Sequence, residues 1–233
     1  MRTLFAGASL ALLALAACSP APLVTEAPVI AAAEIAAPAP ITIAAPAGEY
    51  VSDPNHASVE FKLQHLGLSF YTLKFRTYDA TVAFDPANVA ASKVTATIKP
   101  TDILAGFPGD YVANHPGTKF KSWEEDLATS TNFLDAKQFP TITFTSTLTA
   151  PSGERSAKVT GDLTLKGVTK PITLDVTFSG ETASHPFSKV PAIGFSATGT
   201  FKRSDFGLDY LTGMVGDDVA VEIEGDFIQK IAG

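Results

Sequence analysis

The chain has 233 residues, a net charge of −7 at neutral pH, and a composition that is 45% hydrophobic and 18% charged. An acidic chain without a run of basic residues attracts neither nucleic acid nor anionic headgroups, so its charge excludes both as main partners. Its one cysteine, Cys18, has no partner for an intramolecular disulfide.

The N-terminus has the features of a secretory signal. Arg2 supplies a positive charge, and residues 10–17 form an apolar run that is too short to cross a membrane and that ends in small residues. We therefore expect residues 1–17 to be a signal peptide that directs the chain to the periplasm.

The end of this signal resembles the lipobox of bacterial lipoproteins, because the motif Leu15-Ala16-Ala17-Cys18 places a cysteine directly after the cut. The resemblance implies that Cys18 is acylated, with palmitate as an acyl chain, and anchors the protein to a membrane. Ser19, where an aspartate would retain the protein at the inner membrane, implies the periplasmic face of the outer membrane. The alternative is a soluble periplasmic protein whose cleavage site lies beside a cysteine.

Residues 18–48 are expected to form a lipidated tether rich in alanine and proline. Prolines keep such a segment extended, and they limit any helix in its alanine-rich middle to about two turns. The tether would let the folded part stand clear of the bilayer while staying near it. The remaining residues, 49–233, are enough for one domain with a full core.

Alternating apolar and polar residues predict one strand after another in this domain. The apolar sets, in chain order, are Val59, Phe61 and Leu63; Val94, Ala96 and Ile98; Ile142, Phe144, Ser146 and Leu148; Leu163 and Leu165; Ile172, Leu174, Val176 and Phe178; Phe195, Ala197, Gly199 and Phe201; and Val219, Val221 and Ile223. With residues 73–84 they give about eight strands, and antiparallel strands with one wet face form a sandwich or a closed barrel.

One helix is expected within residues 118–135. Phe120, Trp123 and Leu127 recur there at helical spacing, with acidic residues on the opposite face. This helix and the long loop 100–117 would lie across one end of a barrel.

Six segments resemble, in the same order, motifs of the YceI-like family of secreted lipid-binding proteins. They are YVSDPNHASVEFKLQHLG (50–67), FDPAN (84–88), FLDAKQFPTITFTST (133–147), GDLTLKGVTKPITL (161–174), RSDFGL (203–208) and VGDDVAVEIEGDF (215–227). The resemblance covers residues 49–229. It implies an all-β fold, an antiparallel eight-stranded lipocalin-like barrel with one short helix near one end, which holds a long isoprenoid-type lipid in its lumen for storage or transfer.

The chain has 16 phenylalanines and one tryptophan, and many of the phenylalanines fall on inward-facing positions. Large rings that alternate with small inward residues (Ala96, Ala197, Gly199 and Ser146) leave room for a chain-like lipid. The side chains expected to line the lumen are Phe61, Leu63, Phe84, Phe144, Leu165, Leu174, Phe178, Phe195 and Phe201. His65 ends a strand before a Leu-Gly turn, where it would either contact the headgroup or stabilise the turn.

The sequence contains no pattern typical of catalysis, of a metal site or of a cofactor other than the bound lipid. Its four histidines have no metal-ligand spacing, and it has neither a nucleophile elbow nor a phosphate-binding loop. Two other interpretations stay open: a structural or adaptor lipoprotein with a packed barrel, and an enzyme that acts on a lipid. The sequence also leaves open a homodimer.

Overall fold

The computed structural model of the protein describes residues 42–106 and 108–230. The predicted signal peptide, the acylation site Cys18 and most of the predicted tether lie outside the described residues. In the part of the chain that the structure describes, no helix is long and apolar enough to cross a membrane.

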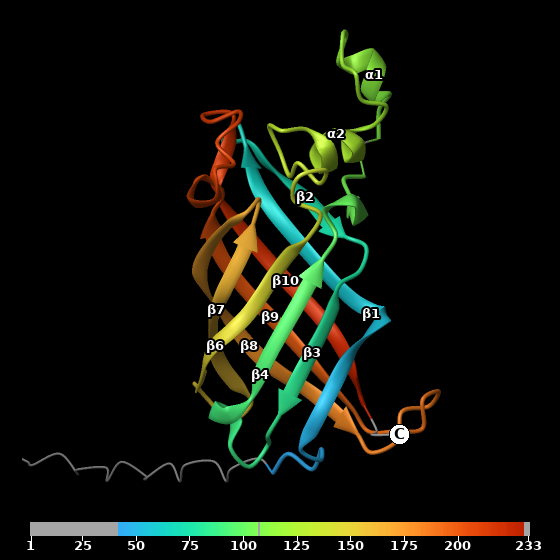
Figure 1. Ribbon diagram of the computed structural model, residues 1–233, viewed down its shortest axis with the longest axis vertical. Helices are drawn as coiled ribbons and strands as arrows, with labels where there is room; N and C mark the ends of the chain where they lie inside the picture. Colours follow the sequence, from blue (N-terminus) through green and yellow to red (C-terminus); the bar gives the residue numbers. More distant parts are fainter. Residues whose placement is uncertain (1–41, 107, 231–233) are drawn as a thin grey trace, which may run out of the picture. The chain divides into compact units, whose positions relative to one another are not determined.

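Eight antiparallel strands form a closed ring (Figure 1). In ring order they are β1 (Gly48–His65), β3 (Asp79–Phe84), β4 (Lys93–Ile98), β6 (Ile142–Pro151), β7 (Ser156–Leu165), β8 (Val168–Thr182), β9 (Ala192–Lys202) and β10 (Val215–Gln229). The ring closes because β10 pairs with β1 from Tyr50↔Gln229 to His65↔Val215. The predicted all-β, lipocalin-like barrel is confirmed. The ring is complete within one compact unit, Pro40–Gly233, which contains its own hydrophobic core, and we therefore expect this unit to fold on its own.

Two further strands extend the wall at one end of the barrel. The second half of β1 pairs with β2 (Ser69–Phe75), whereas its first four residues pair with β3. The two-residue strand β5 (Ile103–Leu104) pairs with β2 in turn. The change of partner falls at a bulge in β1, where residues 53–56 lie opposite Asp226 alone.

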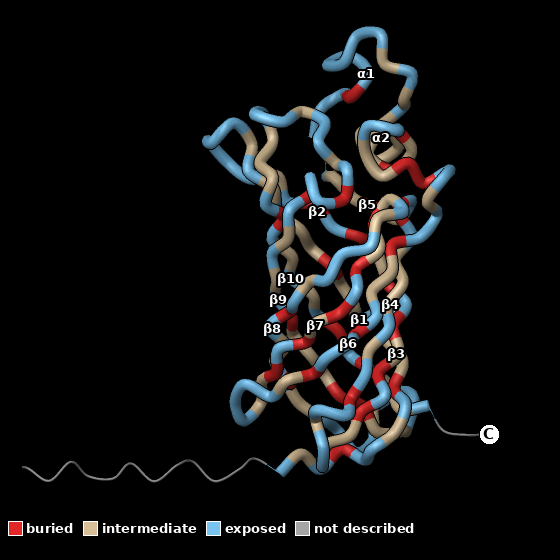
Figure 2. Tube along the Cα trace, turned by 60° about the vertical axis from the view of Figure 1, so that its left-hand side comes forward, coloured by how far each residue is buried: buried red, intermediate tan, exposed pale blue. Residues whose placement is uncertain are grey.

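Two helices lie at this same end (Figures 1 and 2). The predicted helix is α2 (Trp123–Thr129), which is shorter than residues 118–135 because the side chain of Ser122 caps its start by accepting a hydrogen bond from Glu125 N at 3.1 Å. A second helix, α1 (Tyr111–Asn114), was not predicted. Three 3₁₀ turns complete the described structure: η1 (Val89–Ala91), η2 (Pro100–Asp102) and η3 (Arg203–Phe206).

The hairpin of β7 and β8 follows the predicted alternation. Leu165 pairs with Val168 across a two-residue turn in which Lys166 and Gly167 have φ values of 50° and 75°. Pro171 pairs with Asp162, three residues before β9 joins the other side of β8. The missing N–H of this proline therefore removes no ladder hydrogen bond.

The alternation predicted for β6 is wrong beyond Ser146. The pairing register between β6 and β7 shifts at this point, because Ser146 pairs with Gly161 whereas Leu148 pairs with the adjacent Thr160. The extra residue turns Leu148 outward, where it is 58% exposed, and turns Thr149 inward, where its hydroxyl donates to Ser92 O at 2.9 Å. A period of two cannot reveal such a bulge.

The folded part begins a few residues before the predicted boundary at residue 49. Ala45 is buried, and Ile43 packs against the core. The Glu181 carboxylate accepts hydrogen bonds from the backbone N–H groups of Ala44 at 2.8 Å and Ala45 at 2.5 Å. Residues 43–48, predicted as tether, are therefore part of the barrel's packing.

Aromatic side chains fill the barrel where β1 begins, and we call this the closed end. The ring of Phe84 stacks on Phe178 at 5.9 Å and meets Phe195 edge-on at 5.9 Å. Tyr50 packs edge-on against Phe84 at 6.1 Å, and Phe195 against Phe227 at 5.8 Å. These five rings form the aromatic cluster, which leaves no space for a ligand at this end.

Truncating a ring of the aromatic cluster should destabilise the barrel. We expect Phe178→Ala to lower the free energy of unfolding by about 3–5 kcal/mol, because it leaves a cavity among rings that cannot close over it. Urea unfolding monitored by circular dichroism measures this. The exposed Leu148→Ala should cost less than about 1 kcal/mol. Equal effects of the two variants would contradict the assignment of the cluster to the core.

Candidate functional site

A mainly apolar cavity of about 980 Å³ lies inside the barrel and extends from Phe227 of the aromatic cluster to the end that carries the helices. Its size is at the upper limit of sites that hold one small molecule. Nearly every strand contributes aliphatic or aromatic side chains. They include Val59, Phe61, Leu63, Leu73, Phe75, Val94, Ala96, Ile98, Phe144, Leu163, Leu165, Ile172, Leu174, Val176, Ala197, Phe201, Val219, Val221 and Ile223.

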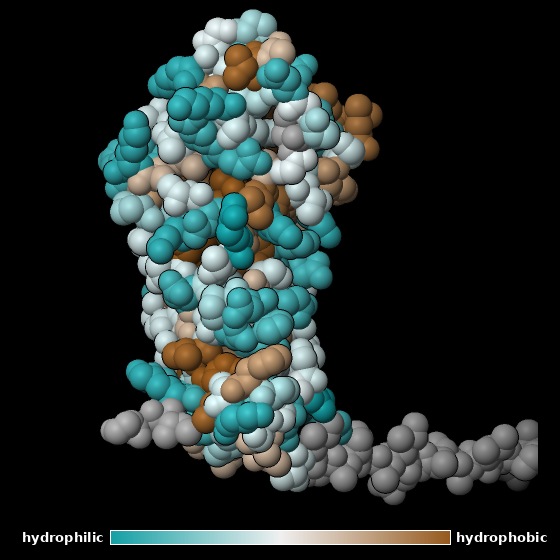
Figure 3. All heavy atoms as spheres, turned by 90° about the vertical axis from the view of Figure 1, so that its right-hand side faces the viewer, coloured by the Kyte–Doolittle hydropathy of each residue, from teal (hydrophilic) through white to brown (hydrophobic). Residues whose placement is uncertain are grey.

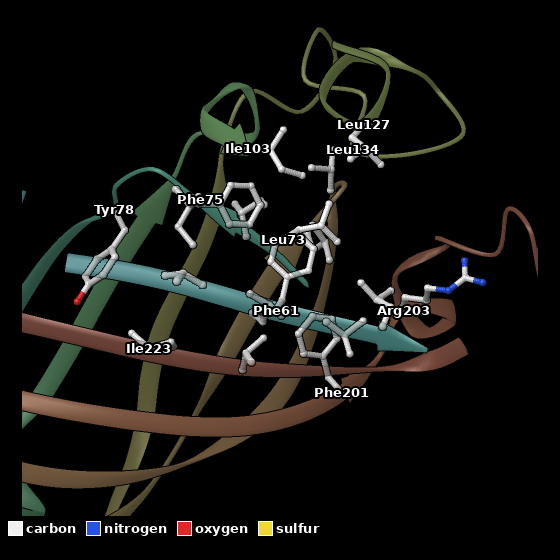
Figure 4. A pocket seen from close by; sticks show the side chains of 18 of the residues that line it. Phe61, Leu73, Phe75, Tyr78, Ile103, Leu127, Leu134, Phe201, Arg203 and Ile223 are labelled. Atoms are coloured by element: carbon white, nitrogen blue, oxygen red, sulfur yellow. The ribbon is translucent and has the colours of Figure 1, made fainter. Parts of the chain in front are cut away.

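The side chain of Tyr78 lines the cavity from the segment between β2 and β3 (Figure 4), and we call this part the floor; the buried Ser92 and Thr149 also line the cavity. The Tyr78 hydroxyl crosses to β10 and donates to Glu224 O at 3.1 Å. Glycine is required at position 225, because a Cβ there would lie 2.0 Å from the Tyr78 oxygen. Burial raises the pKa of the Tyr78 phenol well above its usual value, and the nearby carboxylates of Glu224 and Asp226 add to the shift. Since the hydroxyl is already bonded, the floor presents an apolar surface.

Residues of α2 and of the segment after it complete the wall where the ring of strands widens. Trp123 packs edge-on against Tyr71 of β2 at 5.1 Å. Leu127 and Leu134 point toward Ile103 and the cavity (Figure 4). The helix predicted to lie across one end of the barrel thus forms part of the cavity wall.

The cavity opens to solvent at the end where β1 finishes, and we call this the open end. Three large hydrophobic side chains that line the cavity there are exposed: Phe70, Tyr210 and Met214. The ring of His65 lies 4.6 Å from that of Tyr71 and borders the same opening. The exposed lining residues at the open end give a ligand a route into the cavity from solvent.

Tyr111 and Asp126 form the main polar contact beside this opening. The Tyr111 hydroxyl donates to the Asp126 carboxylate at 2.5 Å, and His115 stacks on the Tyr111 ring at 4.2 Å. Burial, and then the hydrogen bond to Asp126, raise the pKa of Tyr111 to about 12. Polar groups thus border the mouth, whereas the interior is apolar.

Arg203 holds the loop between η3 and β10 in place. Its buried guanidinium donates to the carbonyl of Gly216 at 2.9 Å and to that of Val215 at 2.9 Å. It also donates to the carbonyls of Leu208 and Tyr210. The sequence motif around Arg203 therefore serves to fix the loop, and the guanidinium points away from the centre of the cavity (Figure 4).

The structure brings together seven of the ten residues that the sequence assigned to ligand contact. Those that line the cavity are Phe61, Leu63, His65, Phe144, Leu165, Leu174 and Phe201. Phe84, Phe178 and Phe195 do not, because their rings pack against one another in the aromatic cluster. That any of these side chains binds a ligand stays a prediction.

Only two of the four small residues expected to leave room do so. Ala96 and Ala197 line the cavity. The space beside Gly199 is taken by Leu174, whose side chain would lie 2.7 Å from an added Cβ. Ser146 bonds to β4 by accepting from Val94 N at 2.9 Å.

Sequence reasoning did not assign Tyr78 or Trp123 to the site. Tyr78 follows β2 and reaches a strand that lies 146 residues further along the chain, so no local pattern marks it. Trp123 carried a signal, the apolar face of its helix, but the sequence does not show which surface that face covers.

Within residues 42–106 and 108–230, no three histidine, cysteine, aspartate or glutamate side chains lie close enough together to hold a metal ion. The described buried side-chain nitrogen and oxygen atoms all have hydrogen-bond partners. What the arrangement can do is to enclose an elongated apolar molecule and keep its polar end near the mouth.

The fold and the cavity together define a lipocalin-like barrel with one open end, and the comparisons agree. The YceI-like domain model matches residues 50–227. A UPF0312 protein of Pseudomonas savastanoi pv. phaseolicola is 39% identical over 166 residues, which cover 70% of this chain and 78% of that protein. This chain belongs to the YceI-like family.

Solved structures of similar fold include BcnA of Burkholderia cenocepacia, with a TM-score of 0.62 and 24% identity over 75% of this chain and 98% of that one. A domain of Saccharophagus degradans, described as polyisoprenoid-binding, matches with a TM-score of 0.53 and 13% identity over 79% of this chain and all of its own. At sequence identities this low, the similarity to these two structures establishes a shared fold alone.

The buried phenol at the floor should make the barrel sensitive to base. Because the pKa of Tyr78 is raised in the folded state, its contribution to stability is present below the unfolded pKa of about 10 and is lost as the pH rises beyond it. We expect the free energy of unfolding to fall as the pH rises above about 10, and to fall less steeply in Tyr78→Phe. Urea titrations at each pH measure both slopes, and identical slopes would contradict the assignment.

Replacing the loop-holding guanidinium should loosen the loop specifically. Arg203→Lys keeps the charge but cannot reach four carbonyls, so we expect a loss of about 2 kcal/mol or more in the free energy of unfolding. Amide hydrogen exchange in residues 207–215 should also become faster. Lys202→Met, at the exposed neighbouring position, should leave both measurements nearly unchanged. Unchanged exchange in Arg203→Lys would refute this role.

Proposed function

We propose that this protein binds one long apolar lipid of the isoprenoid type inside its barrel, and stores or transfers it in the cell envelope without chemical change. The observation that carries the proposal is the cavity of about 980 Å³ inside the barrel, whose wall is formed mainly by aliphatic and aromatic side chains. Membership of the YceI-like family supports it, as does the structural neighbour described as polyisoprenoid-binding.

Burial of the tail can supply the affinity. At ~0.8 kcal/mol per CH₂ group, a tail of about twenty carbons gains on the order of 16 kcal/mol before the costs of ordering reduce it heavily. Such a site needs few polar contacts, which agrees with a floor whose hydroxyl is already bonded to Glu224. His65, at the mouth, is placed to contact a headgroup.

The location of the protein is part of the same proposal. Cys18 would carry the acyl chains, and the segment that follows would act as a tether on the periplasmic face of the outer membrane. A carrier held in this way stays within reach of membrane lipids while its barrel remains in water. Mass spectrometry of the N-terminal peptide tests the acylation, and an unmodified or uncleaved Cys18 would refute it.

The two alternatives fare differently. A packed adaptor barrel agrees with the aromatic cluster at the closed end but leaves the cavity unexplained. An enzyme would need a nucleophile or base aimed into the cavity. Among the described residues the Tyr78 hydroxyl is bonded to backbone, and Asp126 accepts from Tyr111.

A larger side chain inside the cavity should abolish lipid binding. Ala197 faces inward between Val176 and Ile223, so Ala197→Phe should fill the path of the tail and lower the affinity for a fluorescent prenyl alcohol at least tenfold. Thr198→Phe is the matched control, since the neighbouring residue on the same strand points outward and is exposed. Fluorescence titration measures both affinities, and unfolding curves check that each variant folds.

Native mass spectrometry of the protein purified from its own host provides a second readout. The wild type should carry one lipid per chain, and Ala197→Phe should be empty. Equal occupancy in the two proteins would place the ligand elsewhere. No uptake of prenyl lipid by the wild type would end the proposal.

A further inference from the structure

The open end of the barrel carries an exposed apolar surface, which we call the apolar rim. It consists of Leu66 and Leu68 in the turn after β1, Phe70 at the start of β2, and Tyr210 and Met214 in the loop between η3 and β10. Leu68 is 84% and Phe70 is 65% exposed. Figure 3 shows hydrophobic side chains gathered near the end of the barrel that carries the helices. Exposed apolar clusters of this kind mark contact surfaces.

Hydrogen bonds join the two segments of the rim into one ordered surface. Leu66 N donates to Met214 O at 2.8 Å, which joins the turn to the loop. Arg203 fixes the loop from below through the carbonyls of Leu208 and Tyr210. The positions of the apolar side chains are therefore set by the fold.

The rim is nearly free of charge, although 18% of the chain's residues are charged. Residues 66–71 include no charged side chain, and residues 207–214 include only Asp209. A surface of this kind matches neither an acidic nor a basic partner. Its leucines, methionine and aromatic rings match the region between headgroups and acyl chains of an uncharged bilayer surface.

Leucine at position 66 is held against its backbone preference. Leu66 has a φ of 52°, in the left-handed region that favours glycine or asparagine. In the rim loop, Leu211 has a φ of 61°. Such backbone strain costs on the order of 1 kcal/mol or more and persists where the residue is needed for another reason.

The rim is continuous with the cavity. Phe70, Tyr210 and Met214 belong both to the exposed surface and to the cavity wall. An apolar chain that leaves the cavity therefore meets the rim first. Its opening lies at the far end of β1 from Gly48, where the chain enters the barrel.

We propose that the apolar rim inserts into the surface of an uncharged bilayer, so that a lipid passes between bilayer and cavity without crossing water. The proposal rests on the proposed function and adds to it the surface through which exchange takes place. Docking of this kind depends on apolar area, and so it should respond little to salt or to anionic lipid.

Two rim residues can be changed without touching the cavity, because Leu66 and Leu68 do not line it. The test uses the fragment Pro40–Gly233, which lacks Cys18, with the double variant Leu66→Asn/Leu68→Asp. Phe187→Asp is the matched control: this residue lies in the loop between β8 and β9 and is 85% exposed. Leu66→Asn alone should keep or raise the stability of the barrel, since asparagine suits a positive φ.

Co-sedimentation measures binding of the protein to phosphatidylcholine–phosphatidylethanolamine vesicles. A second assay measures the rate at which the protein transfers a fluorescent prenyl lipid between such vesicles. We expect the double variant to show at least tenfold weaker vesicle binding and at least tenfold slower transfer. Leu66→Asn alone should weaken both by a smaller factor, and Phe187→Asp should behave as the wild type. The affinity for a prenyl alcohol added without vesicles should stay unchanged. Added phosphatidylglycerol or salt should not strengthen binding.

The proposal is overturned if the wild-type fragment does not bind vesicles, or if the double variant binds and transfers as the wild type does. It is also overturned if the double variant separates a dimer in light scattering, because the rim would then face a second copy of the chain. Failure of the proposed function is a distinct result: the wild type would bind no prenyl alcohol, whatever its behaviour on lipid-only vesicles.

Discussion

The width of a closed eight-stranded ring is the constraint on which the rest of this structure depends. Once β10 has paired with β1, the lumen has a fixed diameter, and side chains decide whether it is filled. Stacked rings, among them Phe84, Phe178 and Phe195, fill the closed end. Above them Ala96 and Ala197 leave the lumen open. One barrel thus has a packed core at one end and an open cavity at the other.

Tyr78 marks the border between these two parts. Its hydroxyl satisfies a carbonyl of β10, and glycine at position 225 makes the approach sterically feasible. The border is therefore apolar although it contains a phenol. A chain-like ligand that enters at the open end would stop against this layer, so that the floor limits how much of a tail can be buried.

Much of the fold could be predicted from the sequence, because in a barrel with a wet outer face each strand alternates with a period of two. From that period, the residues of β1, β7 and β10 that face the interior were predicted correctly. It failed at Leu148, where one extra residue reverses the faces without changing the composition of the strand. It also could not separate Phe61, which lines the cavity, from Phe178, which packs in the cluster. Both face inward, and only three-dimensional neighbours distinguish them.

The ends of the barrel were less predictable than its wall. The contact of Trp123 with Tyr71, and the bond between Leu66 and Met214, join segments that are distant in sequence. At the open end these contacts produce a mouth bordered by polar groups and an apolar rim held partly against backbone preference. Rigid strands thus carry the interior of the site, and loops decide how a ligand reaches it.

The most direct test is a crystal structure of the full chain purified from its own host. The account predicts continuous tubular electron density that starts beside Tyr78 and Phe227, runs through the cavity and ends near the apolar rim. Water-sized peaks alone, or a lumen closed by collapsed side chains, would contradict it.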